Sequence, residues 1–148
     1  MGNLQVRILI ASDRSAWEPL WKGYQIFYKA DLSPEITNTT WQRFLDPAEP
    51  MHALGAFSDG KLIGMVHYLF HRSCWSVVGY CYLQDLFTAP EERGKGAGRA
   101  LIEAVYAAAR EAGASRVYWL THETNSDAMK LYDKVAERSG FLQYRKLF

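Results

Sequence analysis

Residues 85–101 of the chain read DLFTAPEERGKGAGRAL, and this stretch decides how the rest of the fold is interpreted. Its apolar beginning predicts a strand that stops before Pro90, because proline cannot continue a strand ladder. Glycines then alternate at positions 94, 96 and 98, and an alanine-rich segment predicts a helix from there onward. The segment is therefore predicted to be a strand, a glycine loop and a helix.

A strand followed by a glycine loop and a helix N-terminus is suited to binding an anion. Successive backbone N–H groups point into such a loop, and the helix dipole adds about half a positive charge at its mouth. Arg93, Lys95 and Arg99 place three cationic side chains on the same short stretch. The sequence therefore predicts a phosphate-binding loop.

Two common phosphate-binding motifs do not fit this loop. The dinucleotide pattern G-x-G-x-x-G needs a third glycine, but Arg99 or Leu101 stands there when the pattern begins at Gly94 or Gly96. The P-loop pattern needs a glycine where the chain has Ala89, and a serine or threonine where it has Gly96. The pattern that remains is R-x-x-G-x-G over residues 93–98.

The bulk composition is that of one soluble globular domain, predicted to span residues 1–148. A net charge of +1 gives no electrostatic case for a nucleic-acid or membrane partner. The N-terminus lacks a secretory signal pattern, so a cytoplasmic location is expected. The four histidines show no metal-ligand spacing, so no metal is expected. Cys74 and Cys81 are seven residues apart, which favours two unbridged, small buried side chains.

Hydrophobic periodicity and turn signals predict an alternating order of strands and helices. Strands are predicted over residues 4–10, 51–57, 62–71, 75–87, 116–120 and 141–148. Helices are predicted over residues 13–30, 34–45, 97–112 and 125–140. The crossover helix after the glycine loop implies parallel neighbouring strands on either side of it. We expect a mixed α/β sheet with a crevice at the carboxyl ends of this parallel pair.

An aromatic stripe along the first predicted helix allows two interpretations. Its members recur at steps of three and four residues and are Trp17, Leu20, Trp21, Tyr24, Phe27 and Tyr28. Such a stripe ordinarily packs into a core. The polar tips of Tyr24 and Tyr28 would alternatively line a substrate cleft.

At this point the chain resembles the GNAT superfamily of acetyl-CoA-dependent N-acetyltransferases, whose signature is (Q/R)-x-x-G-x-(G/A). Asn125 begins a predicted helix and Tyr132 follows seven residues later, which matches a second motif of the family. Gly140 and Phe141 match the family's usual ending before a last strand. The likeness is closest to the branch that acetylates small amines such as polyamines.

The resemblance implies a mostly antiparallel sheet with a splayed parallel pair at the coenzyme A site, flanked by about four helices. It implies that acetyl-CoA is the co-substrate, with its pyrophosphate on the loop and its pantetheine arm along the strand before it. The residues so implicated are Leu86, Phe87, Thr88, Arg93, Gly94, Lys95, Gly96, Ala97, Gly98, Arg99, Asn125 and Tyr132. Tyr132 would be the general acid, and Asn125 would position the thioester or the pantetheine.

Transfer of an acetyl group needs a neutral amine, and an alkyl ammonium of pKa ~10.4 is only about one part in 2,500 deprotonated at pH 7. A base or a relay of water molecules is therefore expected. The polyamine branch has Leu-Glu-Asp before the loop strand, whereas this chain has Gln84 before Asp85, and an amide cannot accept the proton. Asp85 is the alternative, although it faces away from the Gln84 side on a regular strand. Glu123, His122 and His67 are further candidates.

The function predicted is transfer of the acetyl group of acetyl-CoA to a primary amine of a small molecule, such as a polyamine or amino acid. Attack would be direct, through a tetrahedral intermediate. Tyr24, Tyr28, Gln84 and Glu123 are the substrate-site candidates. A protein lysine or N-terminal acetyltransferase and a non-catalytic acyl-CoA-binding module are the alternatives. The apolar strand predicted at residues 144–148 could pair across a homodimer.

Overall fold

The computed structural model describes residues 3–148 and shows a five-stranded sheet in the order β1-β2-β3-β4-β5. The strands are β1 (Leu4–Ile8), β2 (Met51–Ser58), β3 (Lys61–His71), β4 (Tyr80–Thr88) and β5 (Val117–Tyr118). The α-helices are α1 (Arg14–Phe27), α2 (Pro34–Leu45), α3 (Ala97–Glu111) and α4 (Ser126–Val135). Short 3-10 turns span Ala11–Asp13 (η1) and Pro90–Glu92 (η2).

The sheet is antiparallel from β1 to β4 and parallel only between β4 and β5. The parallel pair is short, with Cys81 opposite Val117 and Tyr82 opposite Tyr118. Strand β4 continues to Thr88, but β5 ends at Tyr118, so the two strands are no longer paired beyond Tyr82 and Tyr118. The predicted mixed sheet is confirmed, and its splayed parallel strands leave one edge of β4 open.

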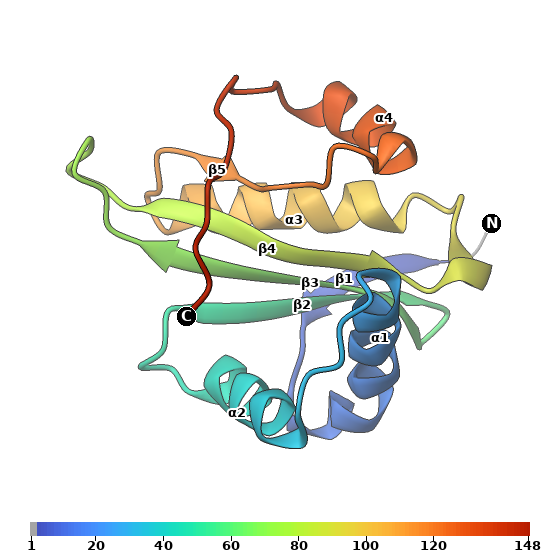
Figure 1. The fold of residues 1–148 in the computed structure, drawn as a ribbon. Coiled ribbons are helices and arrows are strands. Elements are labelled where there is room, and N and C mark those ends of the chain that lie inside the picture. Colours follow the sequence, from blue (N-terminus) through green and yellow to red (C-terminus); the bar gives the residue numbers. More distant parts are fainter. Residues whose placement is uncertain (1–2) are drawn as a thin grey trace.

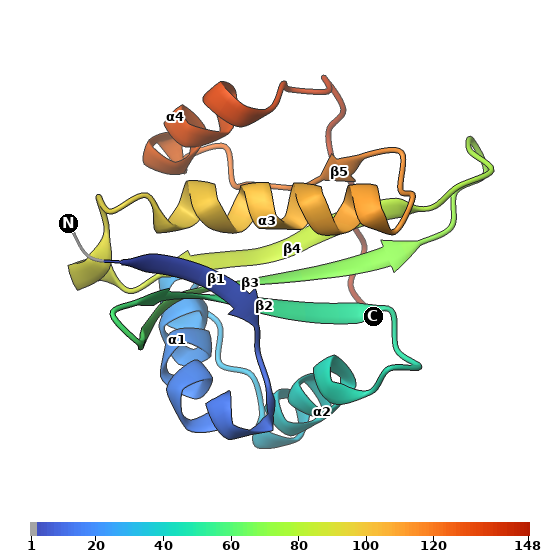
Figure 2. The same ribbon diagram turned by 180° about the vertical axis from the view of Figure 1, so that it is seen from behind.

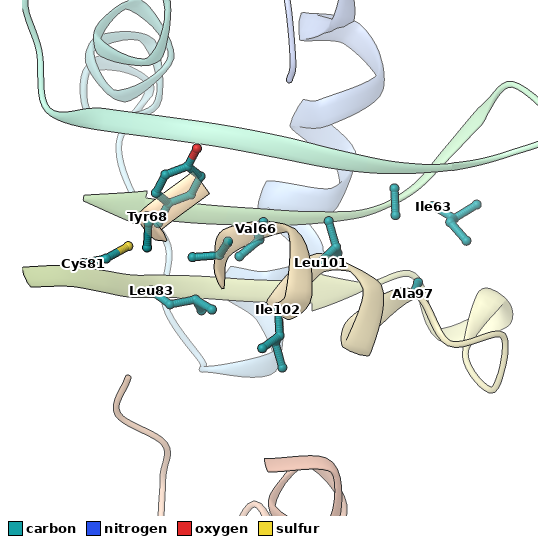
Figure 3. Packing of buried hydrophobic residues seen from close by; sticks show 11 residues of the cluster. Ile63, Val66, Tyr68, Cys81, Leu83, Ala97, Leu101 and Ile102 are labelled. Carbon is teal, nitrogen blue, oxygen red and sulfur yellow. The ribbon is translucent and has the colours of Figure 1, made fainter. Parts of the chain in front are cut away.

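Helices cover both faces of the sheet, with α1 and α2 on one side and α3 and α4 on the other (Figures 1 and 2). On the α3 side, Leu101 and Ile102 are fully buried and pack against Val66 and Leu83 of the strands (Figure 3). On the opposite side, a second core is built mainly from aromatic rings. Its larger members are Trp17, Trp21, Trp41, Met65 and Phe87.

The helix boundaries follow from local chemistry. Ser33 precedes α2 and its hydroxyl accepts the Ile36 N–H at 3.2 Å, while Pro34 occupies the first helical position. Gly113 adopts a φ of 79° just after α3, a conformation that strains other residues and so ends the helix. These boundaries confirm the predicted starts and stops of α2 and α3.

Two predicted boundaries and one predicted strand differ most from the structure. Strand β4 begins at Tyr80 rather than Trp75, because residues 75–79 form an exposed loop in which Trp75 is 88% exposed. Helix α4 ends at Val135 rather than at Gly140. Residues 141–148 form no strand: their apolar side chains stay exposed, because no strand within residues 3–148 pairs with them (Figure 1). Apolar alternation predicts a strand only where an edge is available to pair with it.

The two cysteines are free, as expected, but they differ in burial. Cys81 is buried in the core under α3, whereas Cys74 is exposed, so the prediction of burial is wrong for Cys74. Among residues 3–148, no group of three metal-ligating side chains is gathered in one place. No helix in this range is long and apolar enough to cross a membrane.

Candidate active site

Strand β4 carries a β-bulge next to Asp85, one of the candidate bases. The register pairs His67 with Asp85, but the next residue of β3, Tyr68, pairs with Leu83. Gln84 is therefore the extra residue, and it shifts the side-chain alternation of β4 by one. Cys81 and Leu83 pack under α3, while Asp85 lies opposite His67 on the face covered by α1. The expectation of a regular strand at Asp85 is wrong for this reason.

The charge of Asp85 affects the pKa values of three tyrosines. Burial raises the pKa of Tyr24 far above its ordinary value, and the negative charge of Asp85 raises it further. The pKa values of Tyr28 and Tyr82 are raised for the same two reasons, burial first and Asp85 second. Tyr24 and Tyr28 come from the end of α1 and Tyr82 from β4. The Asp85 side chain is therefore only 13% exposed and has tyrosines among its neighbours.

The aromatic stripe of α1 is partly core and partly surface, so each of the two interpretations applies to one half of it. Its first half is core, since Trp17 and Trp21 are buried against the sheet. Its second half reaches the surface beside Asp85, where Tyr24 stacks on Trp21 with ring centroids 5.7 Å apart and meets Tyr28 at 4.9 Å. A single helix therefore links the aromatic core to the polar site.

Behind Asp85 lies a buried histidine. His67 is 1% exposed, and its Nδ1 is 2.9 Å from Oδ2 of Asp85. Its Nε2 accepts a hydrogen bond from the indole N–H of Trp17 at 3.0 Å. His67 was a candidate base on the sequence, but both of its ring nitrogens are already engaged. It therefore contacts Asp85 from the protein side and not from the solvent side.

The glycine loop continues directly from β4 and opens α3. Gly94 and Gly96 each have a φ of 84°, in the left-handed region, and Gly96 occupies the N-cap of α3. Apart from the adjacent residues, no heavy atom lies within 4 Å of a Cβ built on either glycine, so the space beside the loop is open. Gly98 is more enclosed, with Leu131 of α4 at 3.4 Å from its built Cβ. Ala97 is buried and fixes the first turn of the helix on the sheet.

The cationic side chains of the loop are partly engaged by neighbours. Lys95 pairs with Glu92, and Arg99 pairs with Glu103 one turn along α3 at 2.9 Å. Arg93 donates to the carbonyl of Thr88 at 3.3 Å. These ion pairs are exposed and therefore weak, so an incoming phosphate can compete for the same cations.

The predicted acid, Tyr132, lies on α4 where the helix faces the sheet. Burial, followed by its proximity to Tyr28, raises the pKa of Tyr132 to about 12. Trp119, in the segment leaving β5, meets its ring edge to face at 5.4 Å. Asn125 occupies the N-cap of α4 and its amide donates to Thr121 at 3.4 Å. Trp119 and the N-cap of α4 therefore hold Tyr132 beside the segment that leaves β5.

The remaining candidates for the base and the substrate site are exposed. Gln84 is exposed at the bulge, and Glu123 is exposed on the loop that leads to α4. His122 is also exposed and its Nδ1 contacts the Thr124 hydroxyl at 2.7 Å. Sequence reasoning missed Tyr82, because only the bulge turns Asp85 to the face of the sheet on which Tyr82 lies.

Leu86, Phe87 and Thr88 lie on β4 between the bulge and the loop, each paired with β3 on one side. Strand β5 does not reach them on the other side. Their backbone groups on that side can therefore hydrogen-bond to an extended ligand in the way that an added strand would. The open edge leads from Asp85 to the glycine loop.

Known proteins share this architecture. Residues 14–136 match the acetyltransferase (GNAT) family. A D-amino-acid N-acetyltransferase of Saccharomyces cerevisiae, HPA3, is 41% identical over 143 residues, which are 95% of this chain and 89% of that protein. A thialysine N-epsilon-acetyltransferase of Caenorhabditis elegans is 32% identical over 85 residues, covering 57% of this chain and 52% of that protein.

Solved structures show the same fold at low sequence identity. A ribosomal-protein-alanine N-acetyltransferase from Brucella melitensis superposes with a TM-score of 0.84 at 23% identity, covering 99% of this chain and 100% of the other. The aminoglycoside N-acetyltransferase AAC(6')-Iy, solved in complex with CoA, gives 0.82 at 20% identity, covering 99% and 96%. Because the family match spans residues 14–136 and the yeast relative is 41% identical over 95% of this chain, the chain belongs to the acetyltransferase (GNAT) family and is an acyltransferase.

Proposed function

We propose that the protein transfers the acetyl group of acetyl-CoA to the primary amine of a small molecule. One observation carries the proposal: a single strand, β4, presents Asp85 at its bulge, an open backbone edge beyond it, and the glycine loop at its end. These three features supply a proton acceptor, a binding edge and a phosphate site in the order that an acetylated, phosphate-bearing thioester requires.

The glycine loop is the proposed site of the coenzyme A pyrophosphate. Positive φ values at Gly94 and Gly96 turn the backbone toward open space, and the N-terminus of α3 favours negative charge there. The side chains of Arg93, Lys95 and Arg99 could add ion pairs to the pyrophosphate. The pantetheine arm would lie along Leu86–Thr88, with Asn125 holding it or an ordered water from the α4 side. The AAC(6')-Iy complexes with CoA support acetyl-CoA as the donor for a protein of this fold.

Asp85 is the proposed base. The acceptor arrives as an ammonium ion, which a carboxylate within an aromatic surround attracts through charge and cation–π contacts. Asp85 removes a proton, directly or through one water, and the nitrogen lone pair attacks the thioester carbonyl carbon. A backbone N–H at Leu86 or Phe87 would polarise the carbonyl oxygen. The carbon–nitrogen bond forms first, and the nitrogen of this tetrahedral intermediate, still positively charged, gives its second proton to solvent. The intermediate then collapses to the amide as the carbon–sulfur bond breaks and the thiolate of coenzyme A leaves.

Tyr132 is the proposed partner of the leaving sulfur. With a pKa of about 12 its phenol stays protonated at neutral pH and is available as a donor. Full transfer to a thiolate of ordinary pKa ~8.5 would be uphill by about 5 kcal/mol. We therefore infer that Tyr132 acts mainly by donating a hydrogen bond as negative charge develops on sulfur, and that solvent completes the protonation.

The acceptor is proposed to be a small molecule with a primary amine, such as an amino acid or a polyamine. The names of the yeast and nematode relatives, which acetylate D-amino acids and thialysine, support this class. The test is release of thiol from acetyl-CoA against a panel of D- and L-amino acids, polyamines and lysine-containing peptides. Binding of CoA to the protein is measured in parallel, which separates an enzyme from a binding module.

We further propose that residues 1–148 act as one catalytic domain within a homodimer. The support for a partner copy is the C-terminal segment, where Phe141, Leu142, Tyr144, Leu147 and Phe148 are all at least 76% exposed. Contiguous apolar exposure of this kind is characteristic of an interface. Sedimentation of the full chain and of a chain that ends at Arg138 tests it: a dimer that becomes a monomer supports the proposal, and a monomeric full chain contradicts it.

A further inference from the structure

The buried contact between His67 and Trp17 fixes the protonation pattern of the histidine ring. An indole N–H can only donate, so Nε2 of His67, 3.0 Å away, must be an acceptor. The ring proton of a neutral histidine then resides on Nδ1, which lies 2.9 Å from Oδ2 of Asp85. The chain of donation therefore runs in one direction, from Trp17 to His67 to Asp85.

The aromatic core prevents this chain from rearranging. Trp17 is 0% exposed and His67 is 1% exposed. The ring of Phe44 meets that of His67 at 4.5 Å and the ring of Trp21 meets it at 5.2 Å. A flipped or rotated imidazole would lose both hydrogen bonds in a place that water does not reach, which is costly for buried polar groups.

The polar site borders the same carboxylate. His67 engages Oδ2 of Asp85. Tyr24 and Tyr28, at the end of α1, and Tyr82, on β4, have pKa values raised in part by the charge of Asp85. His67 thus holds one carboxylate oxygen from within the aromatic core, and the second oxygen is not engaged by His67.

We propose that His67 is a positioning residue for Asp85, held by Trp17 as the neutral Nδ1–H tautomer so that Asp85 keeps one oxygen directed at the acceptor amine. This inference rests on the proposed role of Asp85 as the base. Partners that orient a reacting group in this way typically affect activity about 10- to 100-fold when they are removed. His67 acts through Asp85 and does not touch the reactants.

The test is a double-mutant cycle with His67→Leu and Asp85→Asn, measured as kcat and as KM for acetyl-CoA. Leucine fills the space without donating, so kcat should fall about 10- to 100-fold, with KM for acetyl-CoA unchanged. In the Asp85→Asn background the same replacement should change kcat by no more than about 2-fold, because residues that act as one unit are not additive. Losses that multiply in the double variant would overturn the proposal, as would a His67→Leu enzyme with normal kcat.

His67→Asn is the rescue variant, since its amide can donate from nearly the position of Nδ1. It should retain kcat within about 3-fold of wild type, because the donor to Asp85 is kept. An asparagine variant as slow as the leucine variant would also overturn the proposal. Trp17→Phe keeps the aromatic packing but removes the donor to Nε2. Trp17→Phe should lower kcat when residue 85 is aspartate, but not in the Asp85→Asn background. This variant keeps the test available if His67→Leu does not fold.

The matched control is His52→Leu. His52 lies on β2 next to β3 and stacks on Tyr68 at 5.1 Å, on the α3 side of the sheet and away from Asp85. Its replacement should leave kcat unchanged. If Asp85→Asn retains full activity, the proposal that Asp85 is the base is contradicted. That outcome differs from one in which Asp85→Asn loses activity and only His67→Leu remains normal, which contradicts the role of His67 alone.

Discussion

Nδ1 of His67 lies 2.9 Å from Oδ2 of Asp85, and the two residues face each other only because the β3–β4 register slips at Gln84. Without the extra residue, Asp85 would point to the α3 side and would be buried in an apolar core. The bulge therefore turns a carboxylate toward the tyrosines of α1 and into contact with a buried donor. The same strand continues to the glycine loop. Strand β4 therefore connects the proposed base to the proposed phosphate-binding loop.

Replacing Asp85 by Asn should lower kcat/KM for the amine about 10²- to 10⁴-fold at pH 7, the range for loss of a general base. The residual reaction would use only free neutral amine, so it should rise tenfold per pH unit up to about pH 10. The wild-type rate should stay level from neutral pH upward. The measurement is the pH–rate profile of both enzymes.

Glu123→Gln is the control for this experiment. Glu123 is an exposed carboxylate on the loop before α4, and its replacement should leave the profile unchanged. A profile of the Asp85 variant that runs parallel to the wild type, or a large loss in the Glu123 variant, would reassign the base.

Replacing Tyr132 by Phe should reduce kcat about 10- to 100-fold, the value of a hydrogen bond to a developing charge. Binding of CoA should be retained. Because the pKa of Tyr132 is raised to about 12, the wild-type enzyme should show no loss of rate from phenol ionisation below pH 10. Tyr106→Phe is the control: its hydroxyl donates to the Val135 carbonyl at 2.8 Å, so stability should change and turnover should not. Equal kcat for wild type and Tyr132→Phe would remove the proposed donor.

Replacing Gly96 by Ala should raise KM for acetyl-CoA about 10- to 100-fold through one displaced backbone N–H, and should lower stability by about 1–2 kcal/mol because its φ is in the left-handed region. Gly60→Ala is a closely matched control, since Gly60 has a φ of 83° and equally open surroundings in the β2–β3 turn. Both variants should lose similar stability, but KM should change only for Gly96. Similar KM values for the two would contradict a phosphate site at the loop.

Replacing Asp13 by Asn should destabilise the fold by about 1.5–3 kcal/mol at pH 7, because the Asp13 carboxylate accepts charged hydrogen bonds. Arg7 donates to it at 2.8 and 3.0 Å and the Ile10 N–H at 2.8 Å. The Arg7 hydrogen bond, with smaller help from Ile10, lowers the pKa of Asp13 below its ordinary 3.8. The contribution is therefore complete above pH 3.8 and lost as the pH falls through the lower folded-state pKa. Urea unfolding at pH 7 and at pH 3 should show the difference between the proteins shrinking on acidification.

The sequence was most informative where the chemistry is local. Ser33 and Pro34 at α2, the glycine loop, and Gly113 after α3 act through residues next to them, so their predicted elements are confirmed. The chain also shows which helix carries the aromatic stripe. It does not show that the stripe divides into buried tryptophans and half-buried tyrosines.

Features that depend on pairing between distant segments could not be predicted. The slip at Gln84 depends on how β3 lies against β4, and nothing in the local sequence marks it. The contact between Trp17 and His67 joins residues 50 positions apart. The apolar residues 141–148 read as a strand, but a strand forms only against an available edge. For the same reason Asp85 was expected on the wrong face and Tyr82 was missed.

The most direct measurement is release of thiol from acetyl-CoA by the wild-type protein with the panel of amines, with the acetylated product identified by its mass. We predict release that depends on a small primary amine and that falls in both Asp85→Asn and Tyr132→Phe, while CoA binding persists in both. Binding of CoA without turnover on any amine would contradict the account and indicate a binding module. Turnover on lysine-containing peptides alone would contradict the proposed acceptor.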